Sequence, residues 1–539
     1  MTVKYTADQL NTLDEKELSR IVLAQQEQIK SLNESYEKLL EQFRIANQAR
    51  FGRRSEKMDV IDGQLSLFNE AEVTADPNAK EPTAEETVKS YKRKKQKGKR
   101  EEDLKGFPEE EFKHAVTKEE LDKFYGEGNW RAMEPETYKR LRYEPASWTV
   151  EVHTVEVYVG TRGDHQDEFL RGKRPRGLLR NSIVTPSLGA AILNGKYVNA
   201  LPLNRISQEF DRTGLTISRQ TMSNWVIGFS RYFRPLWVRM KEQLLALPVV
   251  QCDETPTVVV NDGNPKSGSK SYMFVHRSSE LIRDKAIILY EYQTTRKHDH
   301  PLEFYKDYVG VLETDGLQQY RIVEQKVEGL TNANCWTHAR RDFADACKAM
   351  DKTNVMAYKS SVAHRALELI GKIFAADEKL KDLTPEDRLR KRKIKVAPLV
   401  EAFFAWAKEQ LASDKLLPKS KTMDGLKYCI EREESLKVFL NNGYVPIDNS
   451  ASERAVRPFC LGKKNWVTIN SIKGANASAE CYSIAESAKA NGLKPYEYFK
   501  YLLTELPNRM DEQGNIDSST LDDLLPWSKS LPEECYKRR

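Results

Sequence analysis

The chain has 539 residues, 39% of them hydrophobic, so it is long enough to form several domains with buried cores. Its 86 Lys and Arg residues against 80 Asp and Glu leave a net charge of only +6, so any binding of a polyanion must come from local clusters of charge. No stretch approaches the ~20 apolar residues of a membrane span and no secretory signal is present, so we expect a cytoplasmic protein without membrane contact. Seven cysteines without a C-x-x-C pair predict buried thiols rather than a zinc site.

The first 50 residues have the pattern of a coiled coil, because mostly apolar residues recur at alternating four- and three-residue steps. Gln25 is the polar position of this seam and would set its register or oligomer number. We favour self-association into a homodimer or higher oligomer over a single helix packed on its own protein. The seam consists of Leu18, Val22, Gln25, Ile29, Leu32, Tyr36, Leu39 and Phe43.

Residues 51–110 have the composition of a linker arm. An acidic stretch at 70–86 is followed by the basic run "YKRKKQKGKR" at 91–100, which has no apolar periodicity. Such a run either neutralises DNA phosphates or is a solvated linker.

The next two segments differ in the spacing of their apolar residues, which is typical of strands in the first and of helices in the second. Residues 111–170 contain "YKRLRYEPASWTVEVHTVEVYV", which alternates apolar and polar residues as strands do. Residues 171–245 are helical in pattern and include a helix-turn-helix candidate: Ile206 and Phe210 on the first helix, a turn at Gly214, and a second helix capped by Ser218. In such a unit the polar side chains at the start of the second helix enter the major groove of DNA. These are Arg219, Gln220, Ser223 and Asn224.

From residue 246 the chain has short strand patterns, which include "PVVQCDETPTVVV", "SYMFVH", "AIILYEY" and "VGVLETDG". Three antiparallel strands, a helix around 302–308 and a further strand predict a mixed α/β sheet. A helical stretch follows, with one apolar face around Ile370 and another around Phe403.

Three acids stand out in this region. Asp253 follows the apolar residues of one strand and Asp315 ends another at a glycine turn. We expect both acids at strand ends, where a carboxylate needs a cation nearby. Glu453 follows in "VPIDNSASERAVRPF", where Ser450-x-x-Glu453 also matches a capping box that would start a helix. Together the three would form an oxygen site for two Mg²⁺ or Mn²⁺ ions, as phosphoryl transfer requires. The neighbouring Glu254 and Glu313 are weaker candidates.

These motifs resemble transposases of the insertion-sequence sixty-six family, which carry an Asp-Asp-Glu triad on a ribonuclease-H-like fold. The resemblance extends over "RFGRRSEK", "GQLSLFNEAE", "CDET", "LETDGLQQY", "CWTHARRDF", "IDNSASERAVRPFCLGKKNW" and "SIAESAKANGLKPYEYF". It implies an α/β catalytic core with an all-helical insertion, preceded by a coiled coil and a helical DNA-binding region. It also implies that Asp253, Asp315 and Glu453 are the catalytic and metal-binding residues.

Other residues in the family motifs are expected to support this chemistry. Asn449 would help to position Glu453. Side chains in "CWTHARRDF" and after Glu453 would contact the scissile phosphate or flanking DNA, although His338 could instead be a core histidine, and the basic run "RLRKRKIK" at 388–395 is a further DNA contact candidate. The expected DNA contacts in these two motifs are His338, Arg340, Arg341, Arg454, Arg457, Lys463 and Lys464.

The chain departs from the family in one segment. Many members have paired C-x-x-C motifs that form a zinc module, whereas residues 111–170 contain no cysteine, so no zinc is expected. The predicted divisions are 1–50 coiled coil, 51–110 linker arm, 111–170 β-rich segment, 171–245 DNA-binding region, 246–510 catalytic domain with a helical insertion at about 345–440, and 511–539 C-terminal tail.

The resemblance implies a nucleoid-associated DNA transposase that binds the terminal inverted repeats of its element and joins the cut ends to target DNA. Small accessory proteins of the same element are possible partners. Two alternatives stay open from the sequence: a catalytically silent DNA-binding regulator, and a metal-dependent nuclease without strand transfer.

Overall fold

The computed structural model describes residues 14, 16–29, 104, 109–144, 147–173, 177–263, 270–350, 355–413, 416 and 420–537. Residues 16–29 are helical, and the apolar side chains of Val22, Leu23 and Ile29 are exposed on this helix. The remainder of the predicted seam, from Leu32 onward, and the linker arm with its basic run at 91–100 lie outside the described residues. Self-association through the seam stays a prediction.

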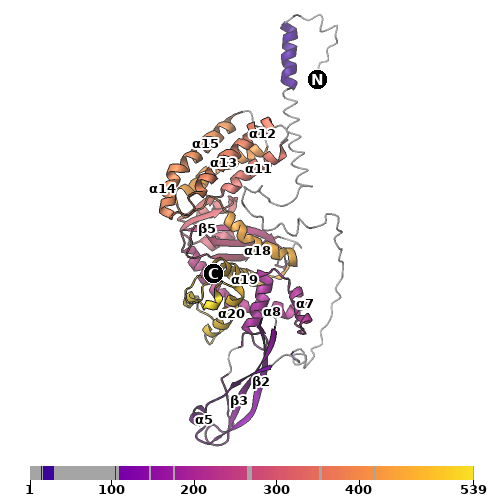
Figure 1. Ribbon diagram of the computed structural model, residues 1–539, viewed down its shortest axis with the longest axis vertical. Helices are drawn as coiled ribbons and strands as arrows, with labels where there is room; N and C mark the ends of the chain where they lie inside the picture. The colour runs from indigo at the N-terminus through magenta and orange to yellow at the C-terminus, as the bar shows by residue number, and fades with distance from the viewer. Residues whose placement is uncertain are drawn as a thin grey trace.

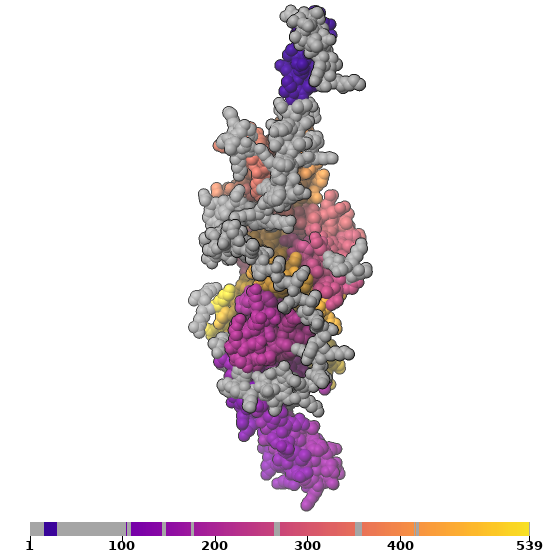
Figure 2. Space-filling model, turned by 90° about the vertical axis from the view of Figure 1, so that its right-hand side faces the viewer, coloured from indigo at the N-terminus to yellow at the C-terminus, as the bar shows by residue number. Residues whose placement is uncertain are grey.

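The cysteine-free segment forms a sheet that projects from one end of the molecule (Figures 1 and 2). The alternation of apolar and polar residues predicts strands here, and the two long strands, β2 and β3, pair antiparallel. Near the tip, Leu121, Tyr125 and Tyr158 make a small apolar core of their own. The elements are β1 (Glu109–His114), α5 (Lys118–Tyr125), β2 (Trp130–Glu144), β3 (Ser147–Gly160) and β4 (Phe169–Arg171), in the order β1-β3-β2 with β4 also paired to β3.

The helix-turn-helix candidate has the predicted turn and cap. Gly214 has φ +84°, a conformation that glycine adopts readily, and Ser218 Oγ accepts the backbone N–H of Thr221 at 3.1 Å. The second helix differs from a short recognition helix, because it runs for 27 residues and buries Phe233 and Trp237 in the main core. The helices are α6 (Pro186–Leu193), the π-helix η1 (Asn194–Val198), α7 (Leu203–Arg212) and α8 (Arg219–Leu245).

A five-stranded mixed sheet forms the centre of the molecule. Its order is β10-β9-β5-β7-β8, with β7 antiparallel to β5 and β8, and with β9 parallel to β5 and β10. The strand patterns predict this mixture. The strands are β5 (Val249–Thr257), β7 (Ser271–Ser278), β8 (Ile288–Gln293), β9 (Gly310–Thr314) and β10 (Leu330–Asn334), while β6 (Val259–Asn261) pairs with β11 (Ile469–Ser471).

Helices cover this sheet from both directions, with the helical insertion above it and α8, α19 and α20 below it in Figure 1. The apolar side chains of the insertion form a core cluster separate from that of α8 and α19. Around the sheet lie α9 (Asp299–Tyr305), α10 (Gln318–Lys326), α18 (Ser450–Trp466), α19 (Ile472–Ala490) and α20 (Pro495–Glu505). The insertion side contains α11 (Trp336–Ala349), α12 (Val355–Ser360), α13 (Val362–Glu378), α14 (Pro385–Lys395), α15 (Ala397–Ala412), α16 (Lys421–Glu431), α17 (Glu433–Lys437) and the 3₁₀ turn η2 (Val438–Leu440).

The C-terminal residues pack on the main core. Leu521, Leu524 and Cys535 are buried in it, and the Tyr498 hydroxyl donates to the Leu524 carbonyl at 2.6 Å. This part contains the 3₁₀ turns η3 (Leu506–Arg509), η4 (Ser518–Thr520), η5 (Asp522–Leu524) and η6 (Glu533–Cys535). Among the helices that the structure describes, none has the length and apolar character needed to span a bilayer.

Candidate active site

Asp253 lies in the middle of β5, not at the end of the strand as the sequence pattern suggests. The strand continues to Thr257 because β7 pairs with residues 250–257, while β9 pairs only with residues 249–251. Asp253 therefore sits just past the point where β5 loses its parallel neighbour.

Glu254, the neighbouring alternative to Asp253 as a metal ligand, is bound by side chains from other elements. Successive side chains of a strand face opposite sides of the sheet. Its carboxylate accepts the Tyr320 hydroxyl at 2.5 Å and Arg296 Nε at 2.6 Å, and only 1% of the side chain is exposed. Glu254 is thus already engaged by α10 and by Arg296, which supports its lower rank as a candidate.

Asp315 directly follows β9, in the turn that leads to α10. Its Oδ1 accepts the backbone N–H of Leu317 at 3.1 Å, and Gly316 has φ +86°. Two side chains from the helical insertion bind the carbonyls of this turn: Tyr428 at Asp315 and Arg432 at Gly316. The sequence offers no signal for these two residues, because they lie more than 100 positions away.

Glu453 lies in the first turns of α18, but the predicted capping box is wrong. The helix begins at Ser450, so Asn449 occupies the N-cap position and its side chain makes no capping hydrogen bond. Instead, Asp448 Oδ1 accepts the Ser450 backbone N–H at 3.0 Å. Asp448 therefore supplies the side-chain oxygen at the start of α18, while the Asn449 side chain binds the Cys252 carbonyl.

Asn449 is fully buried and ties the start of α18 to the sheet. Its Nδ2 donates to the Cys252 carbonyl at 2.8 Å, and its backbone N–H donates to Cys335 Sγ at 3.1 Å. The Cys252 carbonyl immediately precedes Asp253 in the chain. Asn449 therefore links the element that carries Glu453 to the residue beside Asp253.

The charges of the other two acids act on Asp253. Burial raises the pKa of Asp253 well above its usual value, and the charges of Glu254, Asp315 and Glu453 raise it further, against the opposing Glu254 backbone N–H. Burial, followed by the charge of Glu254, also raises the pKa of Asp315 to about 6, although Leu317 N–H, Arg296 and Arg341 lower it. A bound cation relieves the repulsion that raises the pKa of a buried carboxyl group.

The donor chemistry fits a divalent cation, while the side chains as they stand do not enclose one. Carboxylate oxygens are the ligands that Mg²⁺ and Mn²⁺ prefer. Within the described part of the chain, no three or more His, Cys, Asp or Glu side chains are grouped so that they could hold a metal ion.

Glu313, the other alternative to the predicted acids, is buried on β9 and binds a side chain of the neighbouring strand β5. It lies opposite Gln251 in the β5–β9 pair, and its Oε2 accepts Gln251 Nε2 at 2.8 Å. Burial, and then the charge of Asp448, raise the pKa of Glu313 well above its usual value. Because its carboxylate is fully buried and already bound to Gln251, Glu313 is suited to a structural role.

His338 lies against the third acid. Its Nδ1 is 3.8 Å from Glu453 Oε1, its Nε2 is 3.0 Å from an Arg341 nitrogen, and 13% of its side chain is exposed. Burial, and then the charge of Arg341, lower the pKa of His338 to about 4, so the ring is neutral at pH 7. Arg341 is exposed and Arg340 is half-buried on the same helix.

The predicted DNA contacts lie in two places. Arg219, Gln220 and Asn224 are exposed at the start of α8, and Ser223 is half-buried. On α18, Arg457 and Lys464 are exposed. Two other side chains of that helix are engaged within the protein: Arg454 pairs with Glu280 at 2.8 Å, and Lys463 Nζ donates to the Pro256 carbonyl.

Two curated proteins with similar sequences come from Sinorhizobium fredii (strain NBRC 101917 / NGR234), and both are called uncharacterized. Protein y4hP is 26% identical over 362 residues, which cover 66% of this chain and 63% of y4hP. Protein y4qI is 25% identical over 376 residues, which cover 67% of this chain and 66% of y4qI. The chain thus spans just under two thirds of the length of these curated relatives.

Among solved structures, the crystal structure of a pre-cleavage Mos1 transpososome is similar at 13% identity and a TM-score of 0.13, with 50% of this chain and 82% of that chain covered.

Models of protein families match three parts of the chain. "Transposase C of IS166 homeodomain" matches residues 38–111, "Transposase IS66 family" matches residues 181–477, and "IS66 C-terminal element" matches residues 483–527. Since the second match alone covers more than half of the 539 residues, the chain belongs to the IS66 family of insertion-sequence transposases, which are of the DDE type.

Proposed function

We propose that this chain is a DNA transposase that binds the terminal inverted repeats of its insertion sequence and catalyses metal-dependent strand cleavage and strand transfer. The observation that supports the proposal most strongly is the coupling of Asp253, Asp315 and Glu453. Three segments far apart in the sequence bring these acids close enough for the charges of Asp315 and Glu453 to raise the pKa of Asp253. Family membership predicts the same three residues.

In this proposal Asp253, Asp315 and Glu453 hold Mg²⁺ or Mn²⁺. The ions would supply activation of the attacking water or 3′-hydroxyl and stabilisation of the leaving oxygen. Asn449 would keep the element of Glu453 in register with β5 through its bond to the Cys252 carbonyl at 2.8 Å. Neutral His338, 3.8 Å from Glu453, would orient that carboxylate rather than bind DNA directly.

The cationic residues of the proposal act on the DNA backbone. Arg341 is exposed beside His338, and its charge lowers the pKa of Asp315, so it lies where a scissile phosphate would meet the acids. Arg457 and Lys464 would follow the flanking backbone along α18. The exposed side chains at the start of α8 would contact the inverted repeat in the major groove, as a helix-turn-helix does.

Pairing two transposon ends requires two copies of the chain, and we place that contact in the N-terminal coiled coil. Double-stranded DNA, at the element ends and at the target, is the proposed partner. Small proteins encoded by the same element are proposed as accessory factors.

The test is cleavage and joining of labelled DNA that carries the element's terminal repeats, with Mg²⁺ or Mn²⁺. We expect Asp253→Ala, Asp315→Ala and Glu453→Ala each to lose more than about a hundredfold in both steps, since loss of an outer residue alone costs 10- to 100-fold in metal sites. Asp307→Ala, which removes an exposed carboxylate after α9, is the matched control and should behave like wild type.

Two other outcomes would refute the proposal. Cut ends without joined products would identify a nuclease. Specific binding of the ends without cleavage, with accessory proteins present, would identify a DNA-binding regulator. Unchanged cleavage by Asp253→Ala would remove that residue from the triad.

A further inference from the structure

The turn that carries Asp315 is held from outside the sheet by the helical insertion. The Tyr428 hydroxyl, on α16, donates to the Asp315 carbonyl at 2.8 Å. Arg432, directly after α16, donates to the Gly316 carbonyl from Nε and from a terminal nitrogen, each at 3.3 Å. A Cβ on Gly316 would lie 2.6 Å from the Tyr428 hydroxyl, so the glycine is what allows this close approach.

These two side chains are themselves fixed. The Arg432 guanidinium stacks over the Tyr428 ring at 4.3 Å from its centroid. The same helix buries Leu426 and Cys429 in the core of the insertion, against α11. The apolar face of α16 therefore packs into the core of the insertion, while Tyr428 and Arg432 lie outside that core and bind the turn that carries Asp315.

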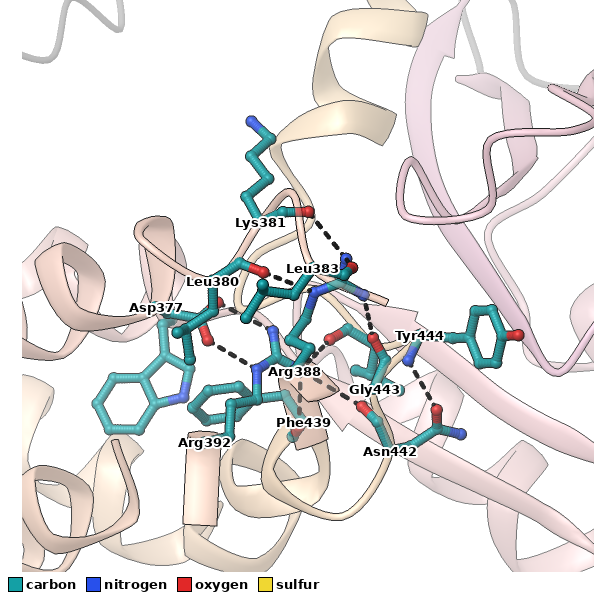
Figure 3. Close-up of polar contacts among 12 residues, drawn as sticks. Asp377, Leu380, Lys381, Leu383, Arg388, Arg392, Phe439, Asn442, Gly443 and Tyr444 are labelled. Atoms are coloured by element: carbon teal, nitrogen blue, oxygen red, sulfur yellow. Dashed lines mark hydrogen bonds and ion pairs between the residues drawn. The ribbon is translucent and has the colours of Figure 1, made fainter. Parts of the chain in front are cut away.

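A second contact from the insertion holds the segment that precedes Glu453. Arg388 and Arg392 on α14 are almost fully buried, at 2% and 1% exposure, so the prediction that the basic run at 388–395 contacts DNA is wrong for these two residues. Arg392 forms a bidentate ion pair with Asp377 at 2.7 and 2.9 Å. Figure 3 shows both guanidinium groups directed at backbone carbonyls.

Arg388 and Arg392 bind backbone carbonyls from two segments of the chain, one just before α14 and one at 439–445. Arg388 binds those of Leu380, Lys381, Leu383 and Gly443, and Arg392 binds those of Phe439, Asn442 and Val445. Residues 439–445 lead directly into Asp448 and α18. Because a guanidinium group has five donors in a rigid fork, it can order several carbonyls at once.

We infer that the helical insertion positions the second and third acids, and that Tyr428 and Arg432 are positioning residues for Asp315. The inference rests on the proposed function in one respect, namely that Asp315 binds the metal ion. The insertion fixes the backbone on which Asp315 and Glu453 stand, so its Tyr428 and Arg432 side chains act on the acids through that backbone.

The test uses Tyr428→Phe and Arg432→Gln in the full-length chain. Tyr428→Phe keeps the ring on which Arg432 stacks and removes only the hydroxyl, so it leaves the packing of α16 intact. Arg432→Lys is the conservative variant and should recover part of the effect through one remaining donor. Matched controls are Tyr501→Phe on α20 and Arg390→Gln, an exposed arginine on α14.

The first measurement is hydrogen exchange of the Leu317 amide, which reports the place of the Asp315 carboxylate because it donates to Oδ1 at 3.1 Å. The second is Mn²⁺ affinity by titration with electron paramagnetic resonance. Loss of one such hydrogen bond predicts exchange faster by about three- to tenfold and Mn²⁺ binding weaker by a similar factor. With terminal-repeat DNA, kcat should fall while KM for the DNA is unchanged.

A merely structural role would give a different result. It would speed exchange equally at Leu317 and at the buried Ile370 in the insertion core, and that outcome would overturn the inference, as would wild-type exchange and wild-type Mn²⁺ affinity in Tyr428→Phe. If Leu317 exchange and Mn²⁺ binding change while the wild type never cleaves DNA, the positioning role stands and the proposed function fails. The two failures are therefore distinguishable.

Discussion

Replacing Asp315 by Asn is expected to stabilise the protein at neutral pH when divalent cations are absent. The pKa of Asp315 is raised from 3.8 to about 6, chiefly by burial and then by the charge of Glu254. Since the folded pKa is above the unfolded pKa, ionisation opposes folding. The free energy of unfolding therefore falls as the pH rises from 3.8 to about 6 and is level above that range.

A pKa difference of this size corresponds to about 3 kcal/mol in the free energy of unfolding above pH 6. Asparagine carries no charge and its Oδ1 can still accept the Leu317 N–H, so Asp315→Asn should recover up to that amount at pH 7.5. At pH 4 the folded wild type is largely protonated at Asp315 and the unfolded chain is about half protonated, so the gain should shrink to less than about 1 kcal/mol.

The assay is urea-induced unfolding of wild type and Asp315→Asn in EDTA at pH 7.5 and pH 4, with Asp307→Asn as a control at an exposed carboxylate. Mg²⁺ at a hundred times its Kd should then stabilise the wild type by about 2.7 kcal/mol and the variant by less. No gain at pH 7.5, or a gain that persists undiminished at pH 4, would refute the reasoning about this charge.

Three further results are expected. Glu480→Gln should stabilise the protein by up to about 3 kcal/mol above pH 7 and not below pH 4.5, because burial raises the pKa of Glu480 from 4.5 to about 7; urea unfolding at pH 8.5 and pH 4.5 checks this, and equal effects at both would contradict it. Arg392→Ala should destabilise by about 3–5 kcal/mol because it leaves Asp377 buried and unpaired, whereas loss of the exposed Arg390 should change stability by less than about 1 kcal/mol. His338→Ala should lower cleavage by about 10- to 100-fold with DNA affinity unchanged, so weaker binding in a gel-shift assay would argue for direct DNA contact instead.

The architecture of the central sheet could be predicted from the sequence because its signals are local. Short β-rich runs separated by turn residues identify β5, β7, β8 and β9, and alternation identifies β2 and β3. The same period of two explains why Asp253 and Glu254, although adjacent, have different surroundings. Only the structure shows that Tyr320 and Arg296 engage Glu254, because those residues come from other elements.

Local patterns misled where a tertiary contact competed with them. Ser450 and Glu453 have the spacing of a capping box, but buried Asn449 takes the N-cap position so that its side chain can reach the Cys252 carbonyl. The run at 388–395 has the composition of a DNA-binding stretch, yet the four-residue spacing of Arg388 and Arg392 puts both on one helical face, which is buried. Composition alone does not distinguish a basic run that binds DNA from one whose arginines are buried in the protein.

A short series of hydrogen bonds joins four elements and so connects the segments that carry the three acids. The backbone N–H of Cys335, after β10, donates to the Thr314 carbonyl at 3.1 Å, next to Asp315. Cys335 Sγ accepts the backbone N–H of Asn449, and Asn449 Nδ2 donates to the carbonyl before Asp253. These last two bonds span 114 and 197 residues of sequence, so no local pattern encodes them. Because Asn449 is the shared member, the distance between Glu453 and the other two acids depends on one buried side chain and on the insertion that delivers it.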